Sequence, residues 1–229
     1  MAGDDWLVGS IRDFYDVYHR HRVRSPDRWM QSNYWPAFRG CTLEVGGGTL
    51  FPRREAYTLV DISMVAVRRV ASESIPALIA DGAHLPFVNE AFDTVACFDV
   101  LEHVVHPVQF LAEMCRMARW RVVVAGPNYV GHHPGGMSRY LPLRWGEFLF
   151  GAGNACSRFS HPHLVFDEQW RPDRDAVSAP NAGWVAKQLR YRGFRISCLR
   201  TWETNYPWLD FIPGLRCLGT FMFVVGDKR

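Results

Sequence analysis

From residue 41 onward, short apolar runs alternate with stretches in which apolar residues recur at helical spacing. Met64–Val70 and Pro107–Ala118 have the helical pattern. The runs that predict strands, three of which end next to an aspartate, are Cys41–Val45, Tyr57–Val60, Ala77–Ala80, Asp93–Phe98 and Arg121–Ala125. Strands that alternate with helices favour a parallel sheet with helices on both faces.

The two ends of the chain extend this pattern. Residues 5–38 predict an amphipathic helix and a second, short helix before Pro36. Near the C-terminus, a helix is predicted over Ala182–Arg192, where Gly193 ends it, and the last two strands over Phe194–Leu199 and Thr220–Val225. The expected architecture is α/β: a doubly wound, mostly parallel seven-stranded sheet.

Residues 127–180 interrupt the alternation, because they are rich in Pro, Gly, His and aromatic residues. They form an insertion after the fifth strand. Ligands of open α/β sheets bind beyond the carboxyl ends of the strands, so the insertion is expected to cover the site. We therefore divide the chain into an N-terminal helical segment or lid, 1–40, and a main domain, 41–229, with 127–180 as its acceptor-site insertion.

Composition narrows the class of protein. The 229 residues suit one domain, or one domain with an elaboration, and 14% of them are aromatic, which suits a pocket for flat or apolar ligands. A net charge of +3 without a dense basic run disfavours nucleic acid as the main partner. Six cysteines without a CxxC pair suggest neither a zinc site nor a disulfide scaffold. With no signal peptide and no apolar stretch of ~18 residues, we expect a cytoplasmic protein without a membrane span.

The candidate chemistry begins with a glycine triplet, Gly46, Gly47 and Gly48, directly after the first strand. Glycines there allow the backbone to approach a ligand closely. Glu44 lies two residues before them, and Asp61 ends the second strand 17 residues after Glu44. A carboxylate at Asp61 can accept hydrogen bonds from both hydroxyls of a ribose.

The third strand ends in a similar way, at Asp81, which is followed by Gly82 and Ala83. A carboxylate in this position can accept from an adenine amino group, while a neighbouring backbone N–H donates to a ring nitrogen. Asp61 and Asp81 together therefore indicate an adenosine site. Solvated carboxylates at the two strand ends are the structural alternative.

A dinucleotide site would share part of this pattern but also needs a helix whose N-terminus faces a pyrophosphate. Here the third glycine of a GxGxxG motif is replaced by Phe51, and Pro52 follows. That helix is expected to be short. A glutamate before the glycines would repel a pyrophosphate, whereas it suits a ligand with an ammonium group.

Four segments in this order, LEVGGG, VDIS, IADGAHLPFVNEAFDTVACFDVLEHV and RVVVAGPN, resemble the class I S-adenosylmethionine-dependent methyltransferases. The subgroup is the small methyltransferase family with an "LPF…FD…LEHV" signature, and the resemblance covers Thr42 to Asn128. It implies a Rossmann-like methyltransferase fold, S-adenosyl-L-methionine as cofactor and methyl transfer as activity.

The resemblance also implies roles for individual residues. Glu44 and the loop Gly46–Gly48 match the segment around the methionine part of the cofactor. Asp61 matches the ribose-binding acid, with Ile62 beside the adenine. The remaining matches are the adenine-binding segment and the end of the fourth strand: Asp81, Gly82, Ala83, Asp99, Val100 and Leu101. His103 falls in the LEHV element, where packing or helix capping is the structural alternative.

The sequence departs from the family pattern in three places. Leu50 stands at the last glycine of the E-x-G-x-G-x-G motif, and the first crossover helix is shortened. Arg119, Trp120 and Arg121 replace the usual proline-glycine turn before the fifth strand. The first two departures affect the expected geometry of the cofactor loop. They leave in place the acidic residues expected to select the cofactor, Glu44, Asp61 and Asp81.

The insertion holds the candidate catalytic residues. His133, beside His132, and His163, in SHPHLVFDE, could take a proton from a hydroxyl acceptor. Backbone hydrogen bonding or passive lining of the pocket remain alternatives for both, and no metal site is expected. Aromatic residues expected to wall the acceptor pocket, or to fold over it as a lid, are Tyr129, Trp145, Phe148 and Phe150, and Tyr15, Tyr18 and Trp29.

The functional expectation is methyl transfer from S-adenosylmethionine to a small organic acceptor such as a sugar, a lipid precursor or a natural product. O-methylation is preferred, because several candidate bases lie in the insertion. The alternatives are an RNA or protein methyltransferase, for which Arg20, Arg22, Arg24 and Arg28 would form a basic stripe, and a non-catalytic scaffold of the same fold without cofactor.

Overall fold

The computed structural model describes residues 5–21, 37–48, 56–129, 157–158, 164, 175–202 and 221–228. The N-terminal helix is α1 (Asp5–His21). The elements after it, in chain order, are β1 (Thr42–Val45), β2 (Tyr57–Asp61), α3 (Met64–Ser72), β3 (Ala77–Ile79), β4 (Phe92–Phe98), the 3₁₀ turn η2 (Leu101–His103), α4 (Pro107–Met117), β5 (Ala118–Pro127), β6 (Ser157–Arg158), β7 (Ser178–Ala179), α6 (Ala182–Tyr191), β8 (Phe194–Trp202) and β9 (Phe221–Lys228).

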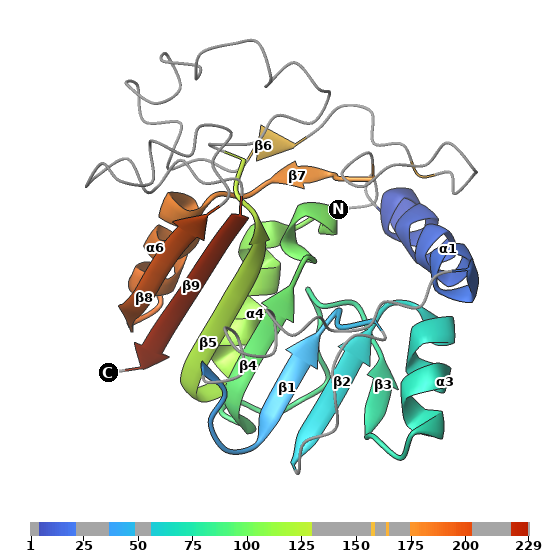
Figure 1. Cartoon of the computed structure of the whole chain (residues 1–229), viewed down its shortest axis with the longest axis horizontal. Helices are drawn as coiled ribbons and strands as arrows, with labels where there is room; N and C mark the ends of the chain where they lie inside the picture. Colours follow the sequence, from blue (N-terminus) through green and yellow to red (C-terminus); the bar gives the residue numbers. More distant parts are fainter. Residues whose placement is uncertain are drawn as a thin grey trace.

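Seven strands form one sheet in the order β3-β2-β1-β4-β5-β9-β8. The strands from β3 to β5 are parallel, whereas β9 runs antiparallel to both β5 and β8. The expected mostly parallel, seven-stranded sheet is thus confirmed. β6 and β7 pair as a separate two-stranded ribbon (Figure 1).

Alternate residues of the strands build two cores on opposite faces of the sheet. On one face, Leu43, Val95 and Val122 pack with apolar residues of α4 and α6. On the other face, Leu59 packs with α3, and Ala96 and Val123 pack with the segment at Phe38. Helices therefore cover both faces, as expected for a doubly wound sheet.

The predicted boundaries differ from the structure mainly at β5. The expected strand Arg121–Ala125 begins earlier, at Ala118, directly where α4 ends. Arg121 takes part in this strand: it is 6% exposed, and its guanidinium donates to Asp227 at 2.6 Å and to the Ala37 carbonyl at 2.9 Å. The partly buried ion pair explains how a charged residue can occupy this strand.

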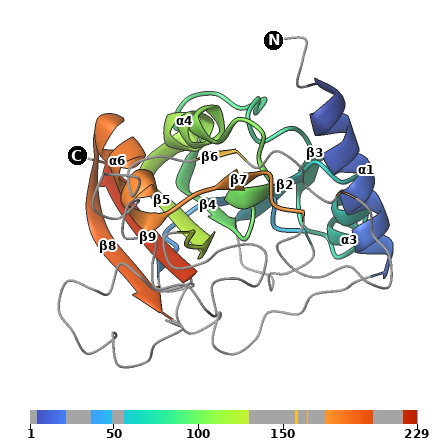
Figure 2. The same ribbon diagram turned by 90° about the horizontal axis from the view of Figure 1, so that it is seen from above.

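The N-terminal segment forms the expected amphipathic helix, with Leu7, Ile11 and Phe14 buried. Figures 1 and 2 show α1 over one end of α3, at the edge of the sheet toward which the parallel strands point. The expected short helix before Pro36 and the shortened crossover after Gly48 lie outside the described residues. Within the described residues, no helix is both long and apolar enough to cross a bilayer.

Candidate functional site

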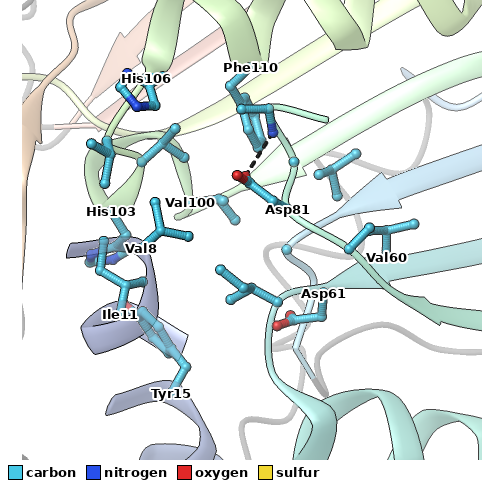
Figure 3. A pocket seen from close by; sticks show the side chains of 18 of the residues that line it. Val8, Ile11, Tyr15, Val60, Asp61, Asp81, Val100, His103, His106 and Phe110 are labelled. Carbon is cyan, nitrogen blue, oxygen red and sulfur yellow. Dashed lines mark hydrogen bonds between the residues drawn. The ribbon is translucent and has the colours of Figure 1, made fainter. Parts of the chain in front are cut away.

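A pocket opens at the carboxyl ends of the parallel strands and encloses about 730 Å³, including its open mouth. Its floor comes from the segments that follow β1, β2, β3 and β4, and its opposite wall comes from α1 and the residues around η2 (Figure 3). The apolar side chains of the second wall are Val8, Ile11, Val104 and Val105. Sheet and helix thus enclose one site from two sides.

The glycine loop after β1 is shaped by backbone requirements. Gly46 and Gly48 have φ angles of +79° and +58°, a region that favours glycine. A Cβ atom on Gly46 would lie 2.6 Å from the Val100 side chain, and one on Gly48 would lie 2.7 Å from the His19 ring. The loop therefore packs too closely on its neighbours to accept larger residues. Gly46 lines the pocket.

Asp61, at the end of β2, is buried and lines the pocket (Figure 3). Its Oδ2 accepts from the Gly48 N–H at 2.9 Å and its Oδ1 from the Ser63 N–H at 2.8 Å. Burial raises the pKa of Asp61 to about 6, although these two hydrogen bonds lower it. A carboxylate oxygen can accept more than one hydrogen bond, so Asp61 retains capacity for a ligand's hydroxyls.

Asp81 follows β3 and lines the same pocket together with Gly82 and Ala83. Its Oδ1 accepts from the Ala83 N–H at 2.9 Å, and its Oδ2 lies 3.4 Å from His84 Nδ1. The side chain of Asp81 is 31% exposed. Gly82 packs against Phe110, because a Cβ there would lie 2.2 Å from the Phe110 ring. This segment places the Asp81 carboxylate in the pocket beside Gly82 and Ala83.

Glu44 lies directly beneath the glycine loop and does not line the pocket. It is fully buried, and a Cβ on Gly47 would lie 2.4 Å from its carboxyl carbon. Neither carboxylate oxygen of Glu44 has a hydrogen-bond partner among the described residues. Burial, and then the nearby Asp61, raise the pKa of Glu44 well above its ordinary value. A buried carboxyl without partners is costly, which marks this position as one that favours a donor or cation.

The end of β4 contributes Asp99 and Val100 to the pocket, whereas Leu101 is buried in the core beneath it. Asp99 has a φ angle of +52°, an uncommon conformation for a residue other than glycine. Its N–H donates to the Ala125 carbonyl at 3.0 Å. Backbone strain of this kind is concentrated at functional sites.

Hydrogen bonds of Tyr15 and Asp16 hold helix α1 beside the pocket. The Asp16 carboxylate accepts from the Ser63 hydroxyl at 2.7 Å and from the Val65 N–H at 3.1 Å, at the N-terminus of α3. The Tyr15 hydroxyl donates to Asp175 Oδ2 at 2.6 Å. Tyr15 and His19 both line the pocket. Helix α1 thus forms one wall of the pocket, and the lid role of residues 1–40 stays a prediction.

An acidic cluster surrounds His103 next to the pocket. His103 Nδ1 lies 3.3 Å from the Asp175 carbonyl oxygen and 3.5 Å from Asp175 Oδ2, and His103 Nε2 lies 3.5 Å from Glu102 Oε1. The Tyr15 ring contacts the His103 ring edge to face, with centroids 5.4 Å apart. Glu102 and Asp175 are both buried, while His103 reaches the pocket. Sequence reasoning did not connect these positions.

The pKa values of Glu102, His103 and Tyr15 in this cluster are all raised. Burial raises the pKa of Glu102 to about 8, although His103 lowers it. Burial lowers the pKa of His103, but Asp175 and Glu102 raise it more, so it lies above its ordinary value. Burial and then Asp175 raise the pKa of Tyr15. Histidine next to buried carboxylates is a common arrangement for proton transfer.

Several residues predicted from the sequence lie outside the described residues, including the catalytic candidates His133 and His163, the residues of the basic stripe beyond Arg20, and Trp29, Trp145, Phe148 and Phe150. Tyr129, which is described, donates its N–H to the Pro180 carbonyl at 3.0 Å and does not line the pocket. Among the described residues, no group of three metal-binding side chains is close enough to hold a metal ion.

Residues 43–123 match the sequence profile of the methyltransferase domain family. This segment contains every proposed contact to the adenosine and methionine parts of the cofactor. The chain carries a class I S-adenosylmethionine-dependent methyltransferase domain.

Solved structures agree on the fold. A SAM-dependent methyltransferase from Thermotoga maritima is 14% identical and has a TM-score of 0.57, with 98% of this chain and 100% of that chain covered. A chain of the complex between the Haloferax volcanii Trm112 methyltransferase activator and a methyltransferase is 15% identical and has a TM-score of 0.54, with 95% and 97% covered. At these identities the likeness shows the fold alone.

Among curated proteins, a tRNA U34 carboxymethyltransferase from Campylobacter curvus is 26% identical over 135 residues. The match includes 56% of this chain but spans only 37% of the length of that relative.

The methyltransferase domain uses S-adenosylmethionine, and the pocket fits that cofactor. Asp61 and Asp81 line the floor of one pocket, as an adenosine requires. The buried carboxyl of Glu44 lacks a partner among the described residues but lies beneath the glycine loop, outside the lining of the pocket. No lysine or arginine of the described residues lines the pocket, so its charged groups favour a cationic sulfonium.

Proposed function

We propose that the methyltransferase transfers the methyl group to a small organic acceptor, which lies in the pocket between the strand ends and α1. The observation that carries this proposal is the apolar wall of the pocket, formed by α1 and the residues around η2. A wall of this kind suits a compact, partly apolar acceptor, because apolar side chains bury such a ligand and exclude water. A sugar, a lipid precursor or a natural product remain the acceptor classes.

For the cofactor, we assign the two ribose hydroxyls to Asp61 and the adenine to Asp81, Gly82 and Ala83, with Ile62 beside the ring. The loop Gly46–Gly48, supported by Glu44 below it, would hold the methionine part. Asp99 and Val100 would lie along the cofactor, with Leu101 supporting them from the core. Asp61 is well placed for this role, because backbone N–H groups already fix both of its oxygens from one side.

When bound, S-adenosylmethionine supplies an electrophilic methyl carbon on a sulfonium. The chain's own contribution is to align the acceptor with this carbon and to keep water out. Val8 and Ile11 of α1 face the strand ends across the pocket (Figure 3) and are placed for both tasks. A general base is needed only where the acceptor atom carries a proton.

The test is transfer of labelled methyl from S-adenosylmethionine to separate pools of small molecules, RNA and protein from the same cell extract. We expect label in the small-molecule pool, and loss of that label with Asp61→Ala. Label confined to RNA or protein would contradict the proposed acceptor. The control is Asp93→Ala, an aspartate outside the pocket, which should keep the labelling pattern.

A second candidate acceptor is RNA. The observation that favours it is the relative from Campylobacter curvus, whose name gives a tRNA uridine as its target. A protein that binds RNA through phosphates loses affinity steeply as salt rises. The affinity of the protein for total tRNA should therefore be measured at several salt concentrations. An affinity that falls steeply with salt, and that small molecules do not reduce by competition, would favour RNA as the acceptor.

A further inference from the structure

The cluster at His103 joins three parts of the chain that are far apart in sequence: α1 through Tyr15, η2 through Glu102 and His103, and the segment before β7 through Asp175. Figure 3 shows His103 at the wall of the pocket, close to Val8 and on the side opposite Asp61. It therefore lies on the acceptor side and away from the proposed adenosine contacts.

The contacts of His103 decide which ring nitrogen can accept a proton. Nδ1 lies 3.3 Å from the Asp175 carbonyl oxygen, and a carbonyl can only accept a hydrogen bond. The neutral ring therefore carries its proton on Nδ1. Nε2 keeps the lone pair, because the two nitrogens of a neutral imidazole divide the roles of donor and acceptor.

Two buried carboxyl groups lie close enough to His103 to stabilise the positive charge that its ring acquires when it takes up a proton. Asp175 Oδ2 lies 3.5 Å from Nδ1 and Glu102 Oε1 lies 3.5 Å from Nε2. Asp175 Oδ1 and Glu102 Oε2 are buried without partners among the described residues, which a purely structural network would avoid. The Tyr15 hydroxyl holds Asp175 in place from α1.

We propose that His103 is the general base of the reaction, that Asp175 and Tyr15 are its positioning residues, and that the acceptor atom is the oxygen of a hydroxyl group. This inference rests on the proposed function, since it assigns an acceptor class to the same pocket. It moves the base from the candidates His133 and His163 to a residue next to the apolar wall.

The proposed step transfers one proton and one methyl group. His103 Nε2 takes the proton of the acceptor hydroxyl while the oxygen's electron pair forms a bond to the methyl carbon. The carbon–sulfur bond breaks, and its electron pair stays on the sulfur of S-adenosylhomocysteine. The imidazolium that results lies between Asp175 and Glu102 and later returns its proton to water.

The pH dependence follows from every titratable group that faces the ring. Among the described residues these groups are Asp99, Glu102, Asp175 and Tyr15, and the three carboxyls all raise the pKa of His103. A base must be unprotonated, so the rate should rise with pH and level off above the pKa of His103, at a midpoint above about 6.5.

The test compares two phenols as probes, 4-methylphenol, which keeps its proton near neutral pH, and 4-nitrophenol, which is largely ionised in mildly alkaline buffer. Methyl transfer is measured by mass spectrometry under single-turnover conditions. His103→Gln should lower transfer to 4-methylphenol by about 10²- to 10⁴-fold, because base catalysis is lost. Transfer to 4-nitrophenol should fall much less, because no proton has to be removed.

Two variants separate positioning from simple loss of structure. Asp175→Asn should shift the pH midpoint for 4-methylphenol downward, because a carboxylate beside Nδ1 is lost. Tyr15→Phe should shift it upward, because Asp175 loses a hydrogen bond that disperses its charge. A structural defect would lower the rate without moving the midpoint in opposite directions. His21→Gln, an exposed histidine outside the pocket, is the matched control.

The experiment distinguishes failure of the proposed base from failure of the proposed methyltransferase function. Each variant is first titrated with S-adenosylhomocysteine, so a folded cofactor site is established independently. Equal losses for both phenols in His103→Gln would overturn the proposal, as would loss only with His133→Gln or His163→Gln. Transfer to neither phenol by wild-type protein that binds S-adenosylhomocysteine would overturn the hydroxyl acceptor, whereas absence of that binding would contradict the proposed function.

Discussion

The two walls of the pocket are built in different ways. The floor comes from loops that follow adjacent parallel strands, so Asp61 and Asp81 are brought together by sheet topology alone. The opposite wall needs three distant segments, and the Tyr15–Asp175 hydrogen bond joins residues 160 positions apart. The proposed cofactor contacts thus lie on the most regular part of the fold, and the proposed acceptor chemistry depends on long-range contacts.

The difference extends to how each wall treats charge. On the floor, Asp61 receives two backbone N–H donors, which are fixed in direction by the loops. On the opposite wall, His103 and its carboxyl neighbours depend on one another, and buried oxygens remain without partners among the described residues. These two arrangements fit the proposed roles, in which the floor binds the cofactor and the opposite wall takes up a proton.

The largest expected loss of cofactor affinity follows from removing the Asp61 carboxylate, the proposed hydrogen-bond acceptor for the ribose hydroxyls. Asp61→Ala should weaken S-adenosylhomocysteine binding by about 100-fold or more, because two hydrogen bonds to a charged group are lost at about 1.5–3 kcal/mol each. Isothermal titration calorimetry measures the change. An affinity within about threefold of wild type would break the proposed division between the walls.

A second prediction uses the ionisation of Asp61. Its pKa is about 6 in the folded protein, against an ordinary 3.8, and ribose hydroxyls bind the ionised form. S-adenosylhomocysteine affinity should therefore rise about tenfold from pH 5 to pH 7.

The same shift in the pKa of Asp61 contributes to the pH dependence of the free energy of unfolding. Between the two pKa values, the folded state binds a proton that the unfolded state releases, so the free energy of unfolding should fall as pH rises through this range, by about 3 kcal/mol in total. Denaturation of wild type and Asp61→Asn at several pH values isolates this contribution. Parallel profiles for the two proteins would contradict it.

A smaller effect is expected at the adenine end. Asp81→Ala should weaken S-adenosylhomocysteine binding by about 1–3 kcal/mol, because an adenine amino group would be left without its acceptor. Asp81 is partly exposed, so water compensates in part and the loss should be smaller than for Asp61. An unchanged affinity would show that the adenine lies elsewhere. Asn89→Ala, outside the pocket, serves as the control for calorimetry.

The smallest effect sharpens the description of the opposite wall. Tyr15→Phe should lower the free energy of unfolding by about 0.5–1.5 kcal/mol, since one hydrogen bond between α1 and Asp175 is lost. Amide hydrogen exchange in α1 should increase. Tyr191 is 86% exposed, so Tyr191→Phe should change neither quantity. Unchanged exchange in α1 with Tyr15→Phe would show that the hydrogen bond does not hold the helix.

The floor of the pocket could be predicted from the sequence, because its information is local. A strand that ends in an acid places that acid at the edge of the sheet, so Asp61 and Asp81 were expected in one place, where the structure has them. Glu44 shows the limit of this reasoning. Its position in β1 was clear, but only the packing of Gly47 reveals that its carboxyl lies beneath the loop.

The opposite wall could not be predicted in the same way. Asp175 lies in a stretch without strong periodicity, and nothing in the sequence relates it to Tyr15 or His103. Hydrophobic burial of α1 brings Tyr15 to the pocket, and the turn of η2 orients His103. The available sequence signal was the aromatic and histidine spacing in α1, where Tyr15 and His19 lie four residues apart on one helical face.

The account depends most on where the cofactor lies, and a crystal structure with S-adenosylhomocysteine tests this directly. We predict that the ribose hydroxyls contact Asp61, that the adenine lies beside Asp81 and Gly82, and that the sulfur faces the wall formed by α1 and His103. Density for the ligand on another face of the sheet, or a pocket that stays closed by side chains at saturating ligand, would contradict the account.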